Sequence, residues 1–249
     1  MTLSSFTMEH PYLDAFVFLL IFVLVLIIFA VANILLATGI LEQVAIVDLI
    51  LAIVGLFLVK RLGWWEKAGY NTGIRLAYVP LLILPCAVAL TSLAEGIRVT
   101  APLEIFTFAV LTLVIGLAEE TFFRGLIFTA LLPAGTLRAV VISSFIFAAL
   151  HLLNISGGTW DLFYTVADTI AAFGLGITYA AIRLRTGSIW PLIGIHALFD
   201  FTLIISLGGI NVSAQSLQVL LTSVVIGIVF IIYGLFLLRA KETRPYEDP

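Results

Sequence analysis

Two neighbouring glutamates and an arginine stand in an otherwise apolar stretch, residues 117–128 (LAEETFFRGLIF). A charged side chain in the middle of a membrane costs about 2.5–3.5 kcal/mol on insertion scales, so such residues usually face a bundle interior and serve a function. Glu120 and Arg124 are four residues apart, on one helix face, where they can form an ion pair. Glu119 lies about 100° further round the helix and has no local partner. The spacing therefore neutralises one carboxylate and leaves the other for chemistry.

Two of the three histidines of the chain also lie inside apolar stretches. His151 ends the stretch FAALH, in which Phe147 lies one helical turn earlier. His196 and Asp200 are four residues apart in HALFD, so the aspartate can fix the imidazole tautomer or bind a metal ion together with it. His10 lies in the polar N-terminal stretch. Two histidines and a carboxylate can hydrolyse an amide, because the reaction needs an activated water, an electrophile for the carbonyl oxygen and an acid for the leaving amine.

The composition predicts the elements that position these residues. Of the 249 residues, 62% are hydrophobic and 11% are charged, and the mean hydropathy is +1.22, whereas a soluble domain is about 45–50% apolar and about 25% charged. We therefore expect an all-α fold, a polytopic integral membrane helical bundle that forms a single membrane-embedded domain over residues 1–249. Apolar runs of about 20 residues predict about eight transmembrane helices, at 13–38, 43–60, 76–96, 102–131, 138–156, 163–183, 188–207 and 216–239.

The basic residues predict the orientation of this bundle. One side carries Lys60, Arg61, Lys67, Arg75, Arg138, Arg183, Arg185, Arg239, Lys241 and Arg244, whereas the opposite loops carry only Arg98. Because Lys and Arg are enriched in cytoplasmic loops, both termini are expected in the cytoplasm. The compact chain favours a prokaryotic plasma membrane, with the endoplasmic reticulum second. The net charge of −3 and the scattered basic residues predict no nucleic-acid partner.

The polar residues of the predicted helices lie at similar depths. At 1.5 Å per residue, Glu119, His151 and Asp200 are each about 18–20 Å from the cytoplasmic ends of their helices. Three helices can therefore converge on one polar pocket, in the middle of the membrane or its inner half. Asp48 and Asp168 are more isolated in the sequence, and we expect them to be helix-packing or cavity residues.

Residues 62–75 (LGWWEKAGYNTGIR) lie between the second and third predicted helices and combine aromatic with basic side chains. Trp64, Trp65 and Tyr70 stand close to Lys67 and Arg75, a composition typical of segments at the membrane interface. Two interpretations are open. The segment is either a simple aromatic anchor or a surface helix that guides a lipid-anchored substrate.

The three motifs, taken in order, resemble a known family. EETFFR matches a Glu-Glu-x-x-x-Arg motif, FAALH matches Phe-x-x-x-His, and HALFD matches His-x-x-x-Asn/Asp. Their order and their placement on three separate helices are similar to the CAAX prenyl endopeptidase-like (CPBP or Abi) family of intramembrane proteases. The motif-bearing core covers residues 100–206. Asp200 stands where the eukaryotic-type members have Asn, and the family pattern allows either residue.

The resemblance implies a bundle of about eight membrane helices that hydrolyses a peptide bond. It implies that Glu119 is the base that activates water, and that His151 and His196 complete the catalytic site with Asp200 beside His196. Glu120 and Arg124 would support the geometry. The residues leave the cofactor open: either the histidines and Asp200 hold one Zn²⁺ at the His151/His196 site, or there is no metal and a histidine stabilises the oxyanion.

Other intramembrane proteases are excluded by their missing motifs. The chain has no HExxH of site-2-type metalloproteases and no GxSG of rhomboid-type serine proteases, and FGLGIT near residue 174 lacks the aspartate of the presenilin-type GxGD. The expected partners are the lipid bilayer and a peptide or lipidated protein substrate, either a prenylated C-a-a-X end or another membrane-associated peptide. Two alternative functions are a transporter or proton relay, and a non-catalytic immunity or scaffold protein in the membrane.

Overall fold

The computed structural model describes residues 9–36, 39–155, 161–210 and 217–239 of the chain, and over these residues it contains helices and turns but no strand. The α-helices are α1 (Pro11–Leu36), α2 (Ile40–Arg61), α3 (Pro80–Thr91), α4 (Pro102–Glu120), α5 (Phe128–Leu131), α6 (Thr136–His151), α7 (Leu162–Thr186), α8 (Trp190–Leu207) and α9 (Leu217–Arg239). The predicted all-α membrane bundle is therefore confirmed, and the chain is an integral membrane protein.

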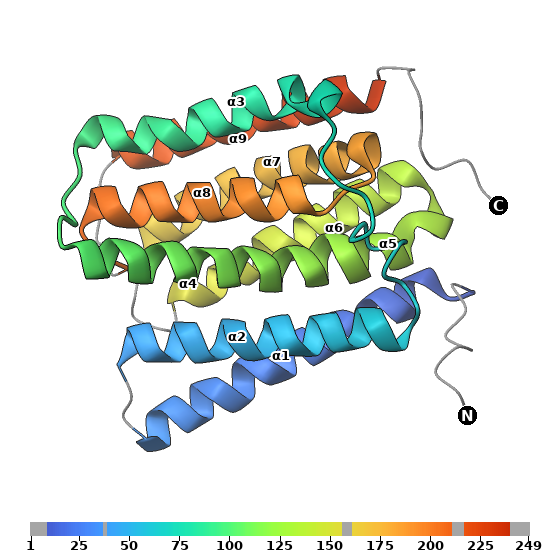
Figure 1. Ribbon diagram of the computed structural model, residues 1–249, viewed down its shortest axis with the longest axis horizontal. Coiled ribbons are helices and arrows are strands. Elements are labelled where there is room, and N and C mark those ends of the chain that lie inside the picture. The colour runs from blue at the N-terminus through green and yellow to red at the C-terminus, as the bar shows by residue number, and fades with distance from the viewer. Residues whose placement is uncertain (1–8, 37–38, 156–160, 211–216, 240–249) are drawn as a thin grey trace.

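The long helices run side by side in layers (Figure 1). Helices α1 and α2 form one edge of the bundle, and α3 and α9 form the opposite edge. Between them, α4 packs against α2 and α8, while α7 packs against α6 and α9. The start of α1 and the end of α9 lie on the same side of the bundle (Figure 1). The two central pairs, α4 with α8 and α6 with α7, carry the residues singled out in the sequence.

A helix lies at each of the eight predicted positions, but only six of these helices are long and apolar enough to cross a membrane. The other two are shorter than predicted: α3 has 12 residues and α6 has 16, or about 18 and 24 Å at 1.5 Å per residue. The α-helix of the third segment begins at Pro80 and contains Pro85, two residues that lack a backbone N–H to donate to a preceding turn. In the fifth segment, α6 gives way to a 3₁₀ turn, Leu152–Ile155, directly after His151.

The fourth predicted helix is a continuous helical rod, Pro102–Ala134, of 33 residues. Its first turn contains Pro102 and Glu104. Proline is tolerated there because the backbone N–H groups of a first turn have no partner within the helix. The Glu104 carboxylate complements the positive end of the helix dipole. After α4 the rod widens into a π-helical segment, Thr121–Ile127, in which every residue is buried. The α-helical geometry resumes with α5.

Helix α7 has a defined cap at each end. At its start, the Asp161 carboxylate accepts a hydrogen bond of 2.8 Å from the backbone N–H of Tyr164, which satisfies one of the free donors of the first turn. At its end, Gly187 takes a left-handed conformation with φ 66°, which a glycine adopts without steric strain. The two caps define the ends of α7, the helix that carries Asp168.

The segment 62–75 folds onto the bundle and contains no α-helix, so the surface-helix interpretation is wrong. Trp64 and Tyr70 are buried, and Trp65 alone of the three aromatic residues is exposed. The segment is held by hydrogen bonds from Arg183 to the Lys67 carbonyl (2.6 Å) and from the Trp190 indole to the Tyr70 carbonyl (3.1 Å). It therefore ties the ends of α7 and α8 together instead of lying free at an interface.

Candidate active site

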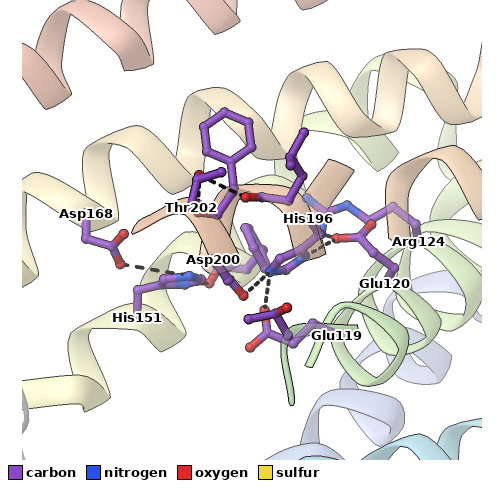
Figure 2. A network of polar contacts seen from close by, with 12 residues as sticks. Glu119, Glu120, Arg124, His151, Asp168, His196, Asp200 and Thr202 are labelled. Atoms are coloured by element: carbon purple, nitrogen blue, oxygen red, sulfur yellow. Dashed lines mark hydrogen bonds and ion pairs between the residues drawn. The ribbon is translucent and has the colours of Figure 1, made fainter. Parts of the chain in front are cut away.

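The predicted site residues are brought together by three α-helices and the π-helical segment that follows α4 (Figure 2). Glu119 and Glu120 end α4, His151 ends α6, and His196 and Asp200 lie on α8. Arg124 lies in the π-helical segment one turn after Glu120. π-helical turns are rare and frequently occur at functional sites, because the extra residue per turn redirects side chains. The contacts given below join these residues into one network.

One carboxylate oxygen of Glu120, Oε1, has two partners, while Oε2 is buried without a hydrogen bond to any described residue. Its Oε1 lies 2.9 Å from Arg124 Nη1 and 2.8 Å from His196 Nδ1, and its side chain and that of Arg124 are 0% and 1% exposed. The Arg124 guanidinium carbon also lies 4.2 Å from the centroid of the Phe147 ring, a distance suited to a cation–π contact. The pairing of Glu120 with Arg124 that the spacing predicts is present, and it extends to His196.

The contact with Glu120 fixes the tautomer of His196. A carboxylate only accepts hydrogen bonds, so Nδ1 of His196 carries a hydrogen and donates it to Glu120. The sequence pattern allows Asp200 to fix the tautomer or to bind a metal ion with His196, but Asp200 faces the other nitrogen: its Oδ2 lies 3.6 Å from His196 Nε2. The tautomer is therefore set across helices by α4 and not within α8. Nε2 is the nitrogen that His196 presents to the site.

Glu119 lies opposite the same nitrogen. Its Oε2 is 3.6 Å from His196 Nε2, longer than a direct hydrogen bond. The Oε2 atom is buried, and within the described part of the chain it makes no hydrogen bond. Glu119 therefore lies close to an imidazole without a recorded hydrogen bond, whereas its neighbour Glu120 is hydrogen-bonded through Oε1 to Arg124 and His196.

His151 is held in a different way, and its partner is a residue that the sequence analysis placed outside the site. Its Nδ1 lies 2.9 Å from the Phe147 carbonyl, and the two rings meet edge to face at 4.7 Å. Its Nε2 lies 3.9 Å from Asp168 Oδ2 on α7. The expectation that Asp168 is a helix-packing or cavity residue did not include this contact with His151. A depth comparison that included Asp168, near the start of its helix, would have placed it beside His151.

Asp48 on α2 also approaches this network. Its carboxylate is within electrostatic range of Glu119, Asp200 and His196, and its side chain is half-buried. The expectation that Asp48 is a cavity residue fits this position. Helix α2 therefore adds a further carboxyl group to a site that already holds Glu119, Asp168 and Asp200.

The end of the π-helical segment nearest to the glutamates is tied to the 62–75 segment. The Tyr70 hydroxyl forms a buried hydrogen bond with Thr121 Oγ1, and Thr121 Oγ1 also bonds with the Leu117 carbonyl. Burial raises the pKa of Tyr70 to about 12, so the hydroxyl keeps its hydrogen at neutral pH. Thr121 directly follows Glu120, and this contact therefore supports the backbone that carries both glutamates.

The arrangement does not match the zinc site that His151 and His196 would form together. In the part of the chain that the structure describes, no three His, Cys, Asp or Glu side chains are grouped so as to hold a metal ion. His196 directs Nε2 at Glu119 and Asp200, while His151 directs its Nε2 at Asp168. The two imidazoles thus have separate carboxylate partners, and we derive no reaction step through a metal.

A comparison with protein families supports the motif assignment. Residues 101–202 match the family model described as type II CAAX prenyl endopeptidase Rce1-like, and this range contains all three motifs. A comparison with curated proteins gives no match. The resemblance seen in EETFFR, FAALH and HALFD is therefore confirmed over residues 101–202, which are similar to the Rce1-like type II CAAX prenyl endopeptidases.

Proposed function

We propose that the protein is an intramembrane endopeptidase that hydrolyses a peptide bond of a lipid-anchored or membrane-associated peptide, with Glu119 as the base that activates water. The observation that carries the proposal is the contrast between the two glutamates. Glu120 is hydrogen-bonded through Oε1 to Arg124 and His196, whereas Glu119 has no recorded hydrogen bond to a described residue; each glutamate also has a buried Oε2 without such a partner. A general base needs a carboxylate that is positioned but still free to take a proton.

The other side chains support the remaining steps. In the first step, Glu119 takes a proton from water while the water oxygen bonds to the carbonyl carbon. The oxyanion that forms needs a donor close by, and we assign this task to Nε2 of His196 in its doubly protonated form, in which Nδ1 donates to Glu120 and Nε2 faces Glu119 and Asp200. In the second step, the carbon–nitrogen bond breaks and the leaving amine takes a proton. We assign that proton to His151, because its Nε2 is the ring nitrogen not bonded to Phe147.

The family description favours a prenylated C-a-a-X substrate, and the helices favour a substrate that arrives within the bilayer. An apolar lipid anchor needs no desolvation to reach a site between membrane helices. We therefore propose a lipid-anchored or membrane-associated peptide as the substrate class and a prenylated C-a-a-X peptide as the first substrate to test.

The experiment is cleavage of a fluorogenic prenylated C-a-a-X peptide by the purified protein in detergent, beside the same peptide without its prenyl group. We expect Glu119→Gln to lower kcat by about 10²–10⁴-fold, the range for removal of a general base. Glu104→Gln is the matched control, because Glu104 lies on the same helix but is exposed at its start. Equal cleavage by wild type and Glu119→Gln would remove Glu119 as the base.

Two further arms separate the finer questions. Activity that survives a strong zinc chelator but not Glu119→Gln supports a glutamate mechanism, and activity lost with the chelator supports a metal-dependent one. Cleavage of the prenylated peptide alone assigns the lipid a role in recognition. If wild type cleaves neither peptide, the assignment of membrane-associated C-a-a-X peptides as the substrate is wrong.

A further inference from the structure

The hydroxyl of Tyr70 reaches the point where α4 passes into the π-helical segment. It lies 2.5 Å from Thr121 Oγ1, in a buried contact between residues that are 51 positions apart in the chain. Thr121 is the first residue of the π-helical segment and directly follows Glu120. The Glu120 carboxylate is also within electrostatic range of the Tyr70 hydroxyl. A residue outside the range that matches the family model therefore contacts the residue next to the two glutamates.

Tyr70 is the donor in this hydrogen bond. The Thr121 hydroxyl has one hydrogen and also bonds with the Leu117 carbonyl, whose oxygen only accepts. The Thr121 hydrogen is therefore donated to Leu117, and the Tyr70 hydrogen is donated to Thr121 Oγ1. Because a phenylalanine ring has no hydroxyl, Tyr70→Phe removes the donor and keeps the ring.

Two tryptophans confine the ring that carries this hydroxyl. Trp65 stacks on Tyr70 with ring centroids 4.6 Å apart, and Trp190 meets the Tyr70 ring edge to face at 5.5 Å. The Trp190 indole also donates its hydrogen bond to the Tyr70 carbonyl. Trp190 is the first residue of α8, so the start of α8 holds both the ring and the backbone of Tyr70.

Further hydrogen bonds fasten the 62–75 segment to the turn between α7 and α8. The Ile189 N–H donates to the Gly69 carbonyl at 3.1 Å, and the Ser188 hydroxyl donates to the Thr72 carbonyl at 2.5 Å. Both donors directly precede α8, the helix that carries His196 about two turns later. The 62–75 segment therefore joins the start of α8 to the end of α4.

We propose that Tyr70 is a positioning residue of the active site, which acts through Thr121 to hold the two glutamates of α4 toward His196. The site depends on contacts between these two helices, from Glu120 Oε1 to His196 Nδ1 at 2.8 Å and from Glu119 Oε2 to His196 Nε2 at 3.6 Å. The chemical consequence rests on the proposed function, because a displaced Glu119 would no longer lie where it can take a proton from the attacking water.

The first test needs no substrate and measures the backbone around the glutamates. Hydrogen–deuterium exchange of the detergent-solubilised protein is followed by mass spectrometry. We expect the backbone amides of residues 117–127 to exchange about fivefold faster in Tyr70→Phe than in the wild type, because loss of one hydrogen bond makes local opening easier by about that factor. Equal exchange over these residues in the two proteins would overturn the proposal.

Tyr233→Phe is the matched control. The Tyr233 hydroxyl donates a hydrogen bond of 3.0 Å to the Leu81 carbonyl, so the substitution removes the same kind of bond between α9 and α3. We expect exchange over residues 117–127 and kcat to equal those of the wild type in Tyr233→Phe. If Tyr233→Phe and Tyr70→Phe change these quantities equally, the effect is one of general stability and the positioning role is disproved.

The second test is the kinetics of cleavage. A misplacement of about 1 Å can cost about 10²-fold in rate, so we expect Tyr70→Phe to lower kcat by at least about tenfold with KM within about twofold. A merely structural loss would lower the amount of folded protein and the unfolding midpoint, but not kcat per folded molecule. Unchanged kcat in Tyr70→Phe would overturn the proposal even if the exchange rate responds.

Thr121 completes a double-mutant cycle for the same hydrogen bond. Thr121→Val removes the acceptor, so we expect the double variant with Tyr70→Phe to have no lower kcat than Thr121→Val alone. Thr121→Ser keeps the hydroxyl and should keep most of kcat. Thr178→Val is the control, since it removes a buried hydroxyl bond of 2.6 Å to the Phe230 carbonyl and should leave kcat unchanged. Losses that simply add in the double variant would show that Tyr70 and Thr121 act separately, against the proposal.

The two tests separate this inference from the proposed function. If Tyr70→Phe speeds exchange over residues 117–127 but the wild type cleaves neither peptide, Tyr70 holds the glutamates and the proposed substrate is wrong. If the wild type cleaves peptide and neither exchange nor kcat responds to Tyr70→Phe, the reaction stands and Tyr70 has no positioning role.

Discussion

At the scale of single residues, Arg124 supplies the positive charge that pairs with the buried carboxylate of Glu120. Its guanidinium is 1% exposed and is bonded to a Glu120 side chain that is 0% exposed. Removing one partner of a buried ion pair leaves an uncompensated charge, at a cost of about 3–5 kcal/mol. We therefore expect Arg124→Ala to lower the thermal unfolding midpoint in detergent strongly. Glu120 would also lose the partner that holds it toward His196, so cleavage should fall as well.

The control for this prediction is Arg138→Ala. Arg138 is exposed and donates a hydrogen bond of 3.3 Å to the Ala134 carbonyl beside the start of α6. An exposed substitution away from caps and cavities usually changes stability by no more than about 0.5 kcal/mol. Equal midpoints for Arg124→Ala and Arg138→Ala would contradict the view that Arg124 neutralises a buried charge.

The residue pairs that could be predicted from the sequence are those on one helix. The spacing of Glu120 and Arg124 predicts their contact, because helical residues four apart lie on one face. The contacts between Glu120 and His196 and between His151 and Asp168 join different helices, and no local spacing encodes them. The local spacing therefore points to Asp200, four residues from His196, as a partner that could fix the imidazole tautomer. In the structure, the Nδ1 hydrogen of His196 is instead donated to Glu120.

At the scale of the elements, a glycine lets α4 and α8 approach closely enough for the site to form. A Cβ atom on Gly116 would lie 2.9 Å from the Ile193 carbonyl oxygen and 3.5 Å from the His196 Cβ. The Ile193 carbonyl oxygen is a backbone atom, so it cannot make room by a change of side-chain rotamer. Gly116 lies about one turn before the two glutamates, so the close approach at this point brings Glu120 within reach of His196.

We accordingly expect Gly116→Ala to push α4 away from α8 and to lengthen the 2.8 Å contact between Glu120 and His196. Overpacking of this kind costs about 1–3 kcal/mol, and a displaced catalytic group can lose up to about 10²-fold in rate. Measurement of kcat and of the unfolding midpoint tests this. Gly194→Ala is the control on α8, since its Cβ would meet nothing within 4 Å. Unchanged kcat in Gly116→Ala would show that the helices can separate without harm to the site.

Hydrophobic runs predict the existence of these helices well and their lengths less well. Each predicted segment contains a helix because lipid forces the backbone to satisfy its own hydrogen bonds. The runs continue past the ends of α3 and α6, however, since residues outside a helix can still be apolar. Leu152, Leu153 and Ile155 follow α6 in a 3₁₀ turn. Because these residues are apolar, their hydropathy alone does not distinguish them from the helix before them. The end of α6 matters because it places His151 at a helix terminus.

At the scale of the whole molecule, the helices and the basic residues together predict how the protein lies in the membrane. The start of α1 and the end of α9 are on one side of the bundle (Figure 1). The sequence places most Lys and Arg residues on that side too, and cytoplasmic loops are enriched in these residues. The expected orientation therefore has the described chain ends, the 62–75 segment and the start of α6 toward the cytoplasm.

The rod Pro102–Ala134 makes this orientation testable with two substitutions. Its 33 residues span about 50 Å at 1.5 Å per residue, more than the roughly 30 Å of the hydrocarbon core. Arg98, just before the rod, and Arg138, just after it, are therefore expected on opposite sides of the membrane, and both are exposed. Because Cys86 is the single cysteine, a Cys86→Ser background gives an unlabelled starting point.

In intact cells we expect a membrane-impermeant maleimide to label Arg98→Cys at once and Arg138→Cys only after permeabilisation. Labelling in the reverse order would place the basic side outside the cell, against the charge bias. Labelling of both positions in intact cells would contradict the rod as a membrane-crossing element.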